Sequence, residues 1–124
     1  MKTAIIIGAS TGIGRETALA LSGKYNSISI TSFKHKEELL SLRDELTAKG
    51  CICYCETGDA GDMDFMEKYI QSTIDHLGSD IDLLVNNAGI SYVGLINDMT
   101  AQDFDRTMKS NVYSVFNSCR LVVP

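Results

Sequence analysis

The sequence predicts an α/β fold, a doubly wound parallel sheet with helices on both faces. Two observations lead to this prediction. Short apolar runs alternate with segments of helical apolar spacing, and their order along the chain is β-α-β-α-β-α-β-α. Such alternation is typical of parallel strands joined by right-handed crossovers. The 124 residues suffice for one domain with a core, residues 1–124, and are too few for two.

Four segments have the short, apolar character of strands that are covered on both faces. They are Thr3–Ile7, Ser27–Ser32, Cys51–Glu56 and Ile81–Val85. Cys51, Cys53 and Cys55 alternate in the third strand, so their side chains should share one face. We interpret them as small buried residues and predict no metal site, because zinc sites use C-x-x-C pairs. A metal or redox role is the alternative.

The helical segments between these strands carry start and stop signals. The second ends at Gly50, and the third begins near Asp62 and Asp64 and ends before Gly78. An irregular stretch, Asn86–Met99, follows the fourth strand.

The last segment is predicted to be one continuous helix. Thr100 is its expected N-cap, with Asp103 in the third helical position, as in a capping box. Apolar side chains then recur at spacings of four, three, four and three, which predicts one apolar face made of Met108, Val112, Val115, Cys119 and Val122.

Charge and hydropathy exclude two classes of partner. The net charge of −5 without a basic stripe argues against nucleic acid. No apolar run approaches the length of a transmembrane helix, so no membrane partner is expected. The apolar run at the start is too short for a secretory signal, and we expect a cytoplasmic location.

A glycine-rich turn, Gly8–Gly14, joins the first strand to the first helix. Binding a pyrophosphate there requires a sharp turn, close approach of the backbone and free N–H groups at the helix start. Glycines allow the first two because they lack a Cβ atom. The spacing is G-x-x-x-G-x-G without Gly-Lys-Ser/Thr, which excludes a P-loop. The turn predicts a Rossmann-type dinucleotide site; a tight connection without ligand is the alternative.

Three further motifs follow in order: Gly58-Asp59-Ala60, Asn86-Asn87-Ala88-Gly89-Ile90, and Asn111 in a helix. With the glycine turn they resemble the short-chain dehydrogenase/reductases, notably bacterial 3-oxoacyl-acyl-carrier-protein reductases. The resemblance covers the whole chain and corresponds to the N-terminal half of that family. It implies a partial sheet of strand order 3-2-1-4, with the later strands missing.

The resemblance also implies roles for individual residues. The residues expected to shape the turn and border the ribose and phosphates are Gly8, Ser10, Thr11, Gly12, Ile13 and Gly14. The residues expected beside the adenine, the ribose and the nicotinamide are Asp59, Ala60, Asn87, Ala88 and Gly89. Asn111 would be the catalytic residue that anchors a water in the proton relay. The alternatives are a strand-end acid at Asp59, loop caps at Asn86 and Asn87, and a plain helix residue at Asn111.

The end of the second strand favours NADP(H) over NAD(H). An acid that binds the ribose 2′-hydroxyl of NAD is expected at the position of Ser32, and the first carboxylate is Glu37. Lys34 and Lys36 lie where a 2′-phosphate needs cations, and Ser32 could donate a hydrogen bond to it. The alternative for the lysines is a solvated loop.

The chain lacks the proton donor of the family. None of its five tyrosines has a lysine four residues later. We therefore predict the cofactor-binding part of an NADP(H)-dependent oxidoreductase that reduces a carbonyl to an alcohol and is inactive alone. The substrate would be a small molecule or a carbonyl bound to acyl-carrier protein, such as a 3-oxoacyl group. A non-catalytic dinucleotide-binding or scaffold module is the alternative.

The missing later strands predict exposed apolar surface. In the order 3-2-1-4 the fourth strand has a bare edge, which invites pairing with another chain. The last helix would also lose much of its cover. We therefore expect this chain to associate, and the resemblance to the family implies a homo-oligomer.

Overall fold

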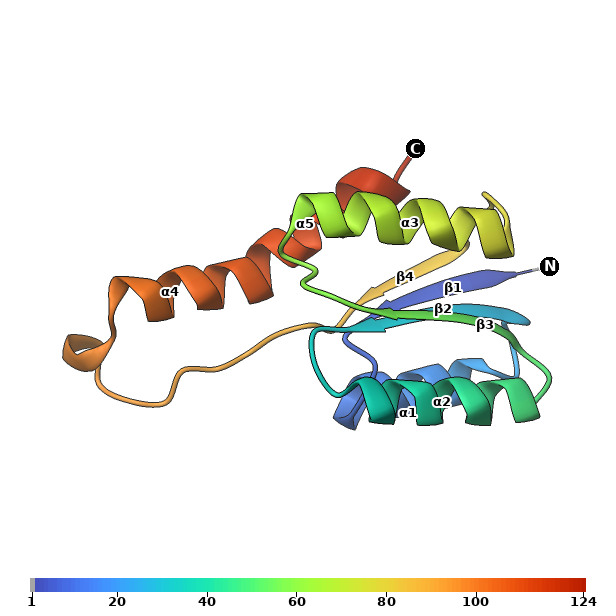
Figure 1. Ribbon diagram of the computed structural model, residues 1–124, viewed down its shortest axis with the longest axis horizontal. Coiled ribbons are helices and arrows are strands. Elements are labelled where there is room, and N and C mark those ends of the chain that lie inside the picture. Colours follow the sequence, from blue (N-terminus) through green and yellow to red (C-terminus); the bar gives the residue numbers. More distant parts are fainter. Residues whose placement is uncertain (1) are drawn as a thin grey trace.

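The computed structural model describes residues 2–124 and shows a parallel sheet between two layers of helices (Figure 1). The strands are β1 (Thr3–Ile7), β2 (Ser27–Ser32), β3 (Ile52–Thr57) and β4 (Leu83–Asn86). All pairings are parallel, and the order is β3-β2-β1-β4. The doubly wound α/β fold and its partial strand order are therefore confirmed.

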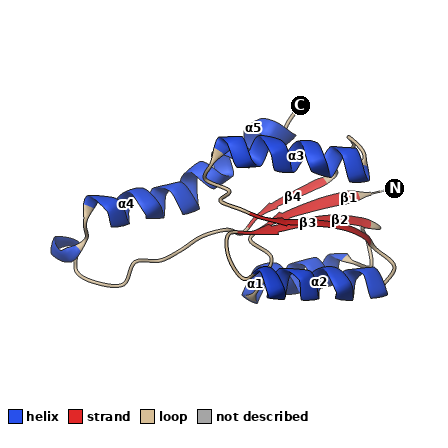
Figure 2. Cartoon of the chain, viewed as in Figure 1, coloured by secondary structure: helices blue, strands red, loops and turns tan. Residues whose placement is uncertain are grey.

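Helices cover both faces of the sheet (Figure 2). On one face lie α1 (Gly12–Leu21) and α2 (Lys36–Ala48), and on the other lie α3 (Met63–Leu77) and α5 (Ser114–Val122). The helix α4 (Ala101–Met108) projects beyond the end of the sheet at which the strands finish (Figure 1). A long loop with one short 3-10 helix, Ile96–Asp98, connects β4 to α4.

Two apolar clusters hold the layers together, because alternate residues of β1 point to opposite faces. Ala4 and Ile6 pack with Ile28, Ile30 and the buried leucines of α2, and Ile5 and Ile7 pack with Met66, Tyr69 and Ile70 of α3. All three alternating cysteines pack against the first cluster, which confirms their shared face. Among residues 2–124, no group of three His, Cys, Asp or Glu side chains is placed to hold a metal ion.

Two predicted strands begin later than expected. The third begins at Ile52 because the Cys51 N–H donates to the Leu46 carbonyl at the end of α2, 3.0 Å away. The fourth begins at Leu83, because at Asp82 a side-chain carboxylate, and not a backbone carbonyl, accepts the hydrogen bond from the neighbouring strand. Its carboxylate accepts the Thr3 N–H at 2.8 Å.

The last helical segment runs without a break from Ala101 to Val122, but it is not a regular α-helix throughout as the apolar spacing predicted. A π-helical segment, Lys109–Tyr113, separates α4 from α5. The wider turn rotates the following helix, so the buried residues of α5 are Ser114, Asn117 and Ser118. Val112 and Val115, two members of the expected apolar face, are 46% and 39% exposed. The capping box at Thr100 is confirmed.

The free edge of the sheet is the one expected from the sequence. Within residues 2–124, β4 pairs with β1 alone, so its outer edge is unpaired. No helix in this range is both long enough and apolar enough to cross a membrane.

Candidate functional site

The loops that follow β1, β2, β3 and β4 meet at the end of the sheet where the strands finish. Ligands of doubly wound sheets bind outside the carboxyl ends of the strands, which is this end. A cavity of about 420 Å³ opens there. It is lined by the glycine turn, the loop after β2, residues 87–90 and two side chains from the helical segment after them, Arg106 and Ser110.

The glycine turn is built by close contact with the loop after β4. Gly8 has a φ of 87°, and a Cβ atom there would lie 2.6 Å from the Ala88 nitrogen. A Cβ atom on Gly14 would overlap the Gly8 carbonyl oxygen. That oxygen accepts a hydrogen bond of 2.8 Å from the Asn87 side-chain amide. The glycines therefore let three chain segments meet where larger residues would force them apart.

The start of α1 fits a pyrophosphate. Thr11 is the N-cap in extended conformation, and within residues 2–124 its side chain caps no helix N–H. The first turn of α1 carries no acidic side chain, so its free N–H groups and positive end face the solvent. Gly12 has a φ of 58° with open space beside it, and Ile13 is 77% exposed. This surface can accept an anionic group against the backbone.

The loop after β2 places cations at the cavity. Lys34 lines it from this loop, and Arg106 adds a second cation from α4. None of the described residues that line the cavity is acidic, although the whole chain has a net charge of −5. Phe33 also lines it, with the Lys34 ammonium 5.6 Å from its ring centre.

Ser32 lines the larger cavity and also makes a hydrogen bond within its own loop. Its hydroxyl donates a 2.6 Å hydrogen bond to the Lys34 carbonyl, and the residue is buried. The hydroxyl proton is therefore engaged within the loop in the ligand-free chain. Ser32 shapes the loop that presents Lys34.

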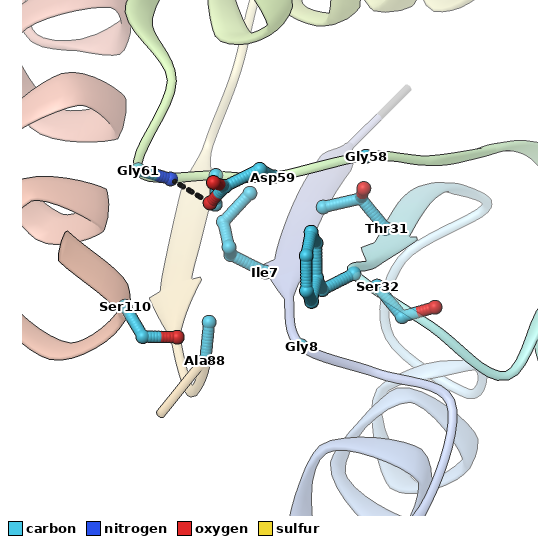
Figure 3. Close-up of a pocket in the computed structure, with 11 residues that line it drawn as sticks. Ile7, Gly8, Thr31, Ser32, Gly58, Asp59, Gly61, Ala88 and Ser110 are labelled. Atoms are coloured by element: carbon cyan, nitrogen blue, oxygen red, sulfur yellow. Dashed lines mark hydrogen bonds between the residues drawn. The ribbon is translucent and has the colours of Figure 1, made fainter. Parts of the chain in front are cut away.

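A second, smaller cavity adjoins the first and contains the motif after β3 (Figure 3). Asp59, Ala60 and Gly58 line it together with Gly8 and Ala88. The Asp59 carboxylate accepts the Gly61 N–H at 2.8 Å, and its other oxygen lies 3.2 Å from the Lys109 ammonium. In Figure 3 Asp59 lies on the segment that runs from Gly58 to Gly61, beside Ile7 at the end of β1.

Asn111 clamps a loop. Its side-chain oxygen accepts the Ile90 N–H at 2.7 Å, and its amide donates to the Ile90 carbonyl at 2.8 Å. A Cβ atom on Gly89 would lie 3.1 Å from that side-chain oxygen. The π-helical segment thus fixes the course of residues 89–90, and π-helical turns often occur at functional sites.

The structure brings most predicted site residues together. The larger cavity is lined by Gly8, Ser10, Thr11, Ser32, Lys34, Asn87, Ala88 and Gly89. Asp59 and Ala60 line the smaller one. Gly12, Ile13 and Gly14 lie on the adjoining helix start and Asn111 on the adjoining π-helical segment, outside the two linings.

Five residues at the larger cavity were not among the predicted site residues: Phe33, His35, Ile90, Arg106 and Ser110. Phe33 and His35 flank Lys34 in the loop after the second strand. Their position next to Lys34 is the sequence signal that could have identified them. Arg106 and Ser110 come from a helical segment remote in sequence, and nothing in their local pattern marks them.

Comparison with known proteins agrees with this geometry. The family model for short chain dehydrogenases matches residues 2–124. The chain is 32% identical to the 3-oxoacyl-acyl-carrier-protein reductase FabG of Staphylococcus aureus over 99% of its own length and 50% of the relative's. It is 31% identical to the uncharacterized oxidoreductase YhdF of Bacillus subtilis, covering 43% of that protein.

Solved structures show the same fold. A short-chain dehydrogenase/reductase from Serratia marcescens superposes with a TM-score of 0.91 at 26% identity, over 98% of this chain and 49% of that one. A blue fluorescent protein from a metagenomic library, in complex with NADPH, also gives 0.91, at 32% identity over 98% and 49%. The chain spans about half the length of the curated relatives it matches. The chain belongs to the short-chain dehydrogenase/reductase family, whose members are oxidoreductases that bind a nicotinamide dinucleotide.

Proposed function

We propose that residues 1–124 are the cofactor-binding part of an NADP(H)-dependent oxidoreductase that reduces a carbonyl to an alcohol. The observation that carries the choice of NADP(H) is the charge of the larger cavity. Lys34 and Arg106 line it, and none of its described lining residues is acidic. A carboxylate at the end of β2, which would bind the ribose 2′-hydroxyl of NAD, is replaced by Ser32.

The residues of the chain would bind and orient the cofactor. The α1 start would hold the pyrophosphate, Lys34 the 2′-phosphate, and Asp59 the adenine. Residues 87–89 would border the nicotinamide path, supported by the Asn111 clamp on Ile90. When bound, the reduced nicotinamide supplies the hydride that adds to the carbonyl carbon.

The proton for the resulting alkoxide has no family-type donor in these residues. The 124-residue sequence contains no Tyr-x-x-x-Lys, so we propose that this chain binds the cofactor and does not turn it over alone. The likeness to FabG supports a 3-oxoacyl group on acyl-carrier protein as one substrate of the complete enzyme. The absence of Tyr-x-x-x-Lys from these residues equally favours a second candidate, a non-catalytic dinucleotide-binding or scaffold module.

Charge reversal at Lys34 tests the choice of cofactor. The Kd values of NADPH and NADH are measured for the parent chain, for Lys34→Glu and for Lys24→Glu. Lys24 is a matched control because it follows α1 at the opposite end of the sheet. Lys34→Glu removes an exposed charge-assisted contact worth about 1.4 kcal/mol, so the preference for NADPH should fall about tenfold. An unchanged preference in Lys34→Glu, or an equal fall in Lys24→Glu, contradicts the proposal.

A further inference from the structure

We propose that Lys109 is a positioning residue that holds the Asp59 carboxylate toward the purine and thereby sets selectivity for a 6-amino purine. This inference rests on the proposed function, because it takes the adenine of the cofactor to lie beside Asp59. Lys109 belongs to none of the motifs in the sequence, and it comes from the π-helical segment on the far side of the cavity.

The carboxylate of Asp59 is held from two sides. One oxygen accepts the Gly61 N–H at 2.8 Å, and the other lies 3.2 Å from the Lys109 ammonium. A carboxylate offers about four acceptor positions, so these two donors leave room for another. An exocyclic amino group of a purine can therefore donate to Asp59 without displacing Lys109.

The lysine side chain reaches Asp59 by crossing directly over Gly61. A Cβ atom on Gly61 would overlap Lys109 Cγ and lie 2.5 Å from the Lys109 carbonyl oxygen. Gly61 is buried, which shows that the lysine stem covers it. The stem and the ammonium thus fix the same turn that carries Asp59, one by packing and the other by charge.

A second contact makes this connection rigid. The side-chain amide of Asn117, buried on α5, donates to the Ala60 carbonyl at 3.1 Å. The loop after β3 is therefore gripped at Asp59 and at Ala60 by one continuous helical region. The Asn117 contact holds the backbone of the loop, and the Asp59 side chain is then directed by the Gly61 N–H on one oxygen and by Lys109 on the other.

The position of the carboxylate decides between two purines. An adenine presents an N–H donor at carbon 6, whereas a hypoxanthine presents a carbonyl oxygen, which a carboxylate repels. If a neutral residue replaces Lys109, Asp59 keeps only the Gly61 N–H as a partner, and its second oxygen is no longer held in place. Binding of the 6-amino cofactor should weaken, while binding of the 6-oxo cofactor should change little.

The test compares NADPH with its hypoxanthine analogue, which differs in the 6-position alone. Kd values are measured for the parent chain, Lys109→Met, Lys109→Gln and Lys109→Arg, with Lys68→Met on the exposed side of α3 as control. We expect the parent to prefer NADPH by about tenfold. The preference should fall at least threefold in Lys109→Met and Lys109→Gln through weaker NADPH binding, and Lys109→Arg should restore it.

Asp59→Asn separates the possible failures. If it removes the preference and the neutral Lys109 variants keep it, the inference on Lys109 is overturned and the adenine site stands. If Asp59→Asn also keeps the preference, adenine does not lie beside Asp59. If the parent chain binds neither nucleotide, the proposed function fails, and the inference fails with it.

Discussion

Replacing Gly14 with alanine tests the packing of the glycine turn. Gly14 lies in the first turn of α1, where its Cα faces the Gly8 carbonyl oxygen. An added Cβ atom would overlap this oxygen and lie 2.6 Å from the Asn87 side-chain nitrogen. The overlapped atom is backbone, so the methyl group can be accommodated only if α1 moves away from the turn.

The expected loss of stability has two parts. Overpacking of a well-packed contact costs about 1–3 kcal/mol. The movement also stretches the 2.8 Å hydrogen bond from Asn87 to Gly8, which contributes about 1 kcal/mol. We therefore expect Gly14→Ala to lower the free energy of unfolding by about 2–4 kcal/mol.

Two other glycines provide matched controls. Gly12 has open space beside it but a φ of 58°, so Gly12→Ala should cost about 1–2 kcal/mol through backbone strain alone. Gly23 has open space and an ordinary φ, so Gly23→Ala should stay within about 0.5 kcal/mol of the parent. Urea unfolding followed by circular dichroism measures all three. A Gly14→Ala variant as stable as Gly23→Ala would refute the packing argument.

Three further predictions concern the clamp, the thiols and the surface. Asn111→Ala removes both bonds to Ile90, and amide exchange at Ile90 should become faster by a factor of about 5–30, whereas Asn97→Ala should leave it unchanged. Burial raises the pKa of the Cys53 thiol to about 12, so between about pH 8.5 and 12 the unfolded chain releases a proton that the folded chain keeps. Stability should therefore fall with rising pH by up to about 1.4 kcal/mol per pH unit, and Cys53→Ala should flatten this slope. The exposed Val115 and the free edge of β4 should make the chain associate, and light scattering that shows a monodisperse monomer would contradict this expectation.

Local pattern predicted those elements whose own residues determine their structure. Thr3–Ile7 and Ser27–Ser32 were placed with correct bounds because each is a buried strand with apolar or small side chains throughout. The glycine turn was identified because a sharp strand-to-helix connection needs residues without a Cβ atom. Gly78 ends α3 as expected, with a φ of 94°.

The π-helical segment could not be predicted, because it is produced by contacts between distant residues. The apolar spacing from Met108 onward fits a regular helix, and only the bonds from Asn111 to Ile90 and from Lys109 to Asp59 show what the wider turn achieves. The buried polar face of α5 has the same cause. Asn117 binds the loop after β3, and Ser118 donates to the Asn86 side chain at 2.6 Å.

The central claim is that these residues bind NADP(H) through the turn at Gly8–Gly14 and the cations around Lys34. Its most direct test is a titration of the 124-residue chain with NADPH and with NADH, in which binding is measured by calorimetry and by nicotinamide fluorescence. We predict one site per chain, tighter binding of NADPH than of NADH, and no consumption of NADPH when a carbonyl substrate is added. Failure to bind either nucleotide, or tighter binding of NADH, would contradict the claim.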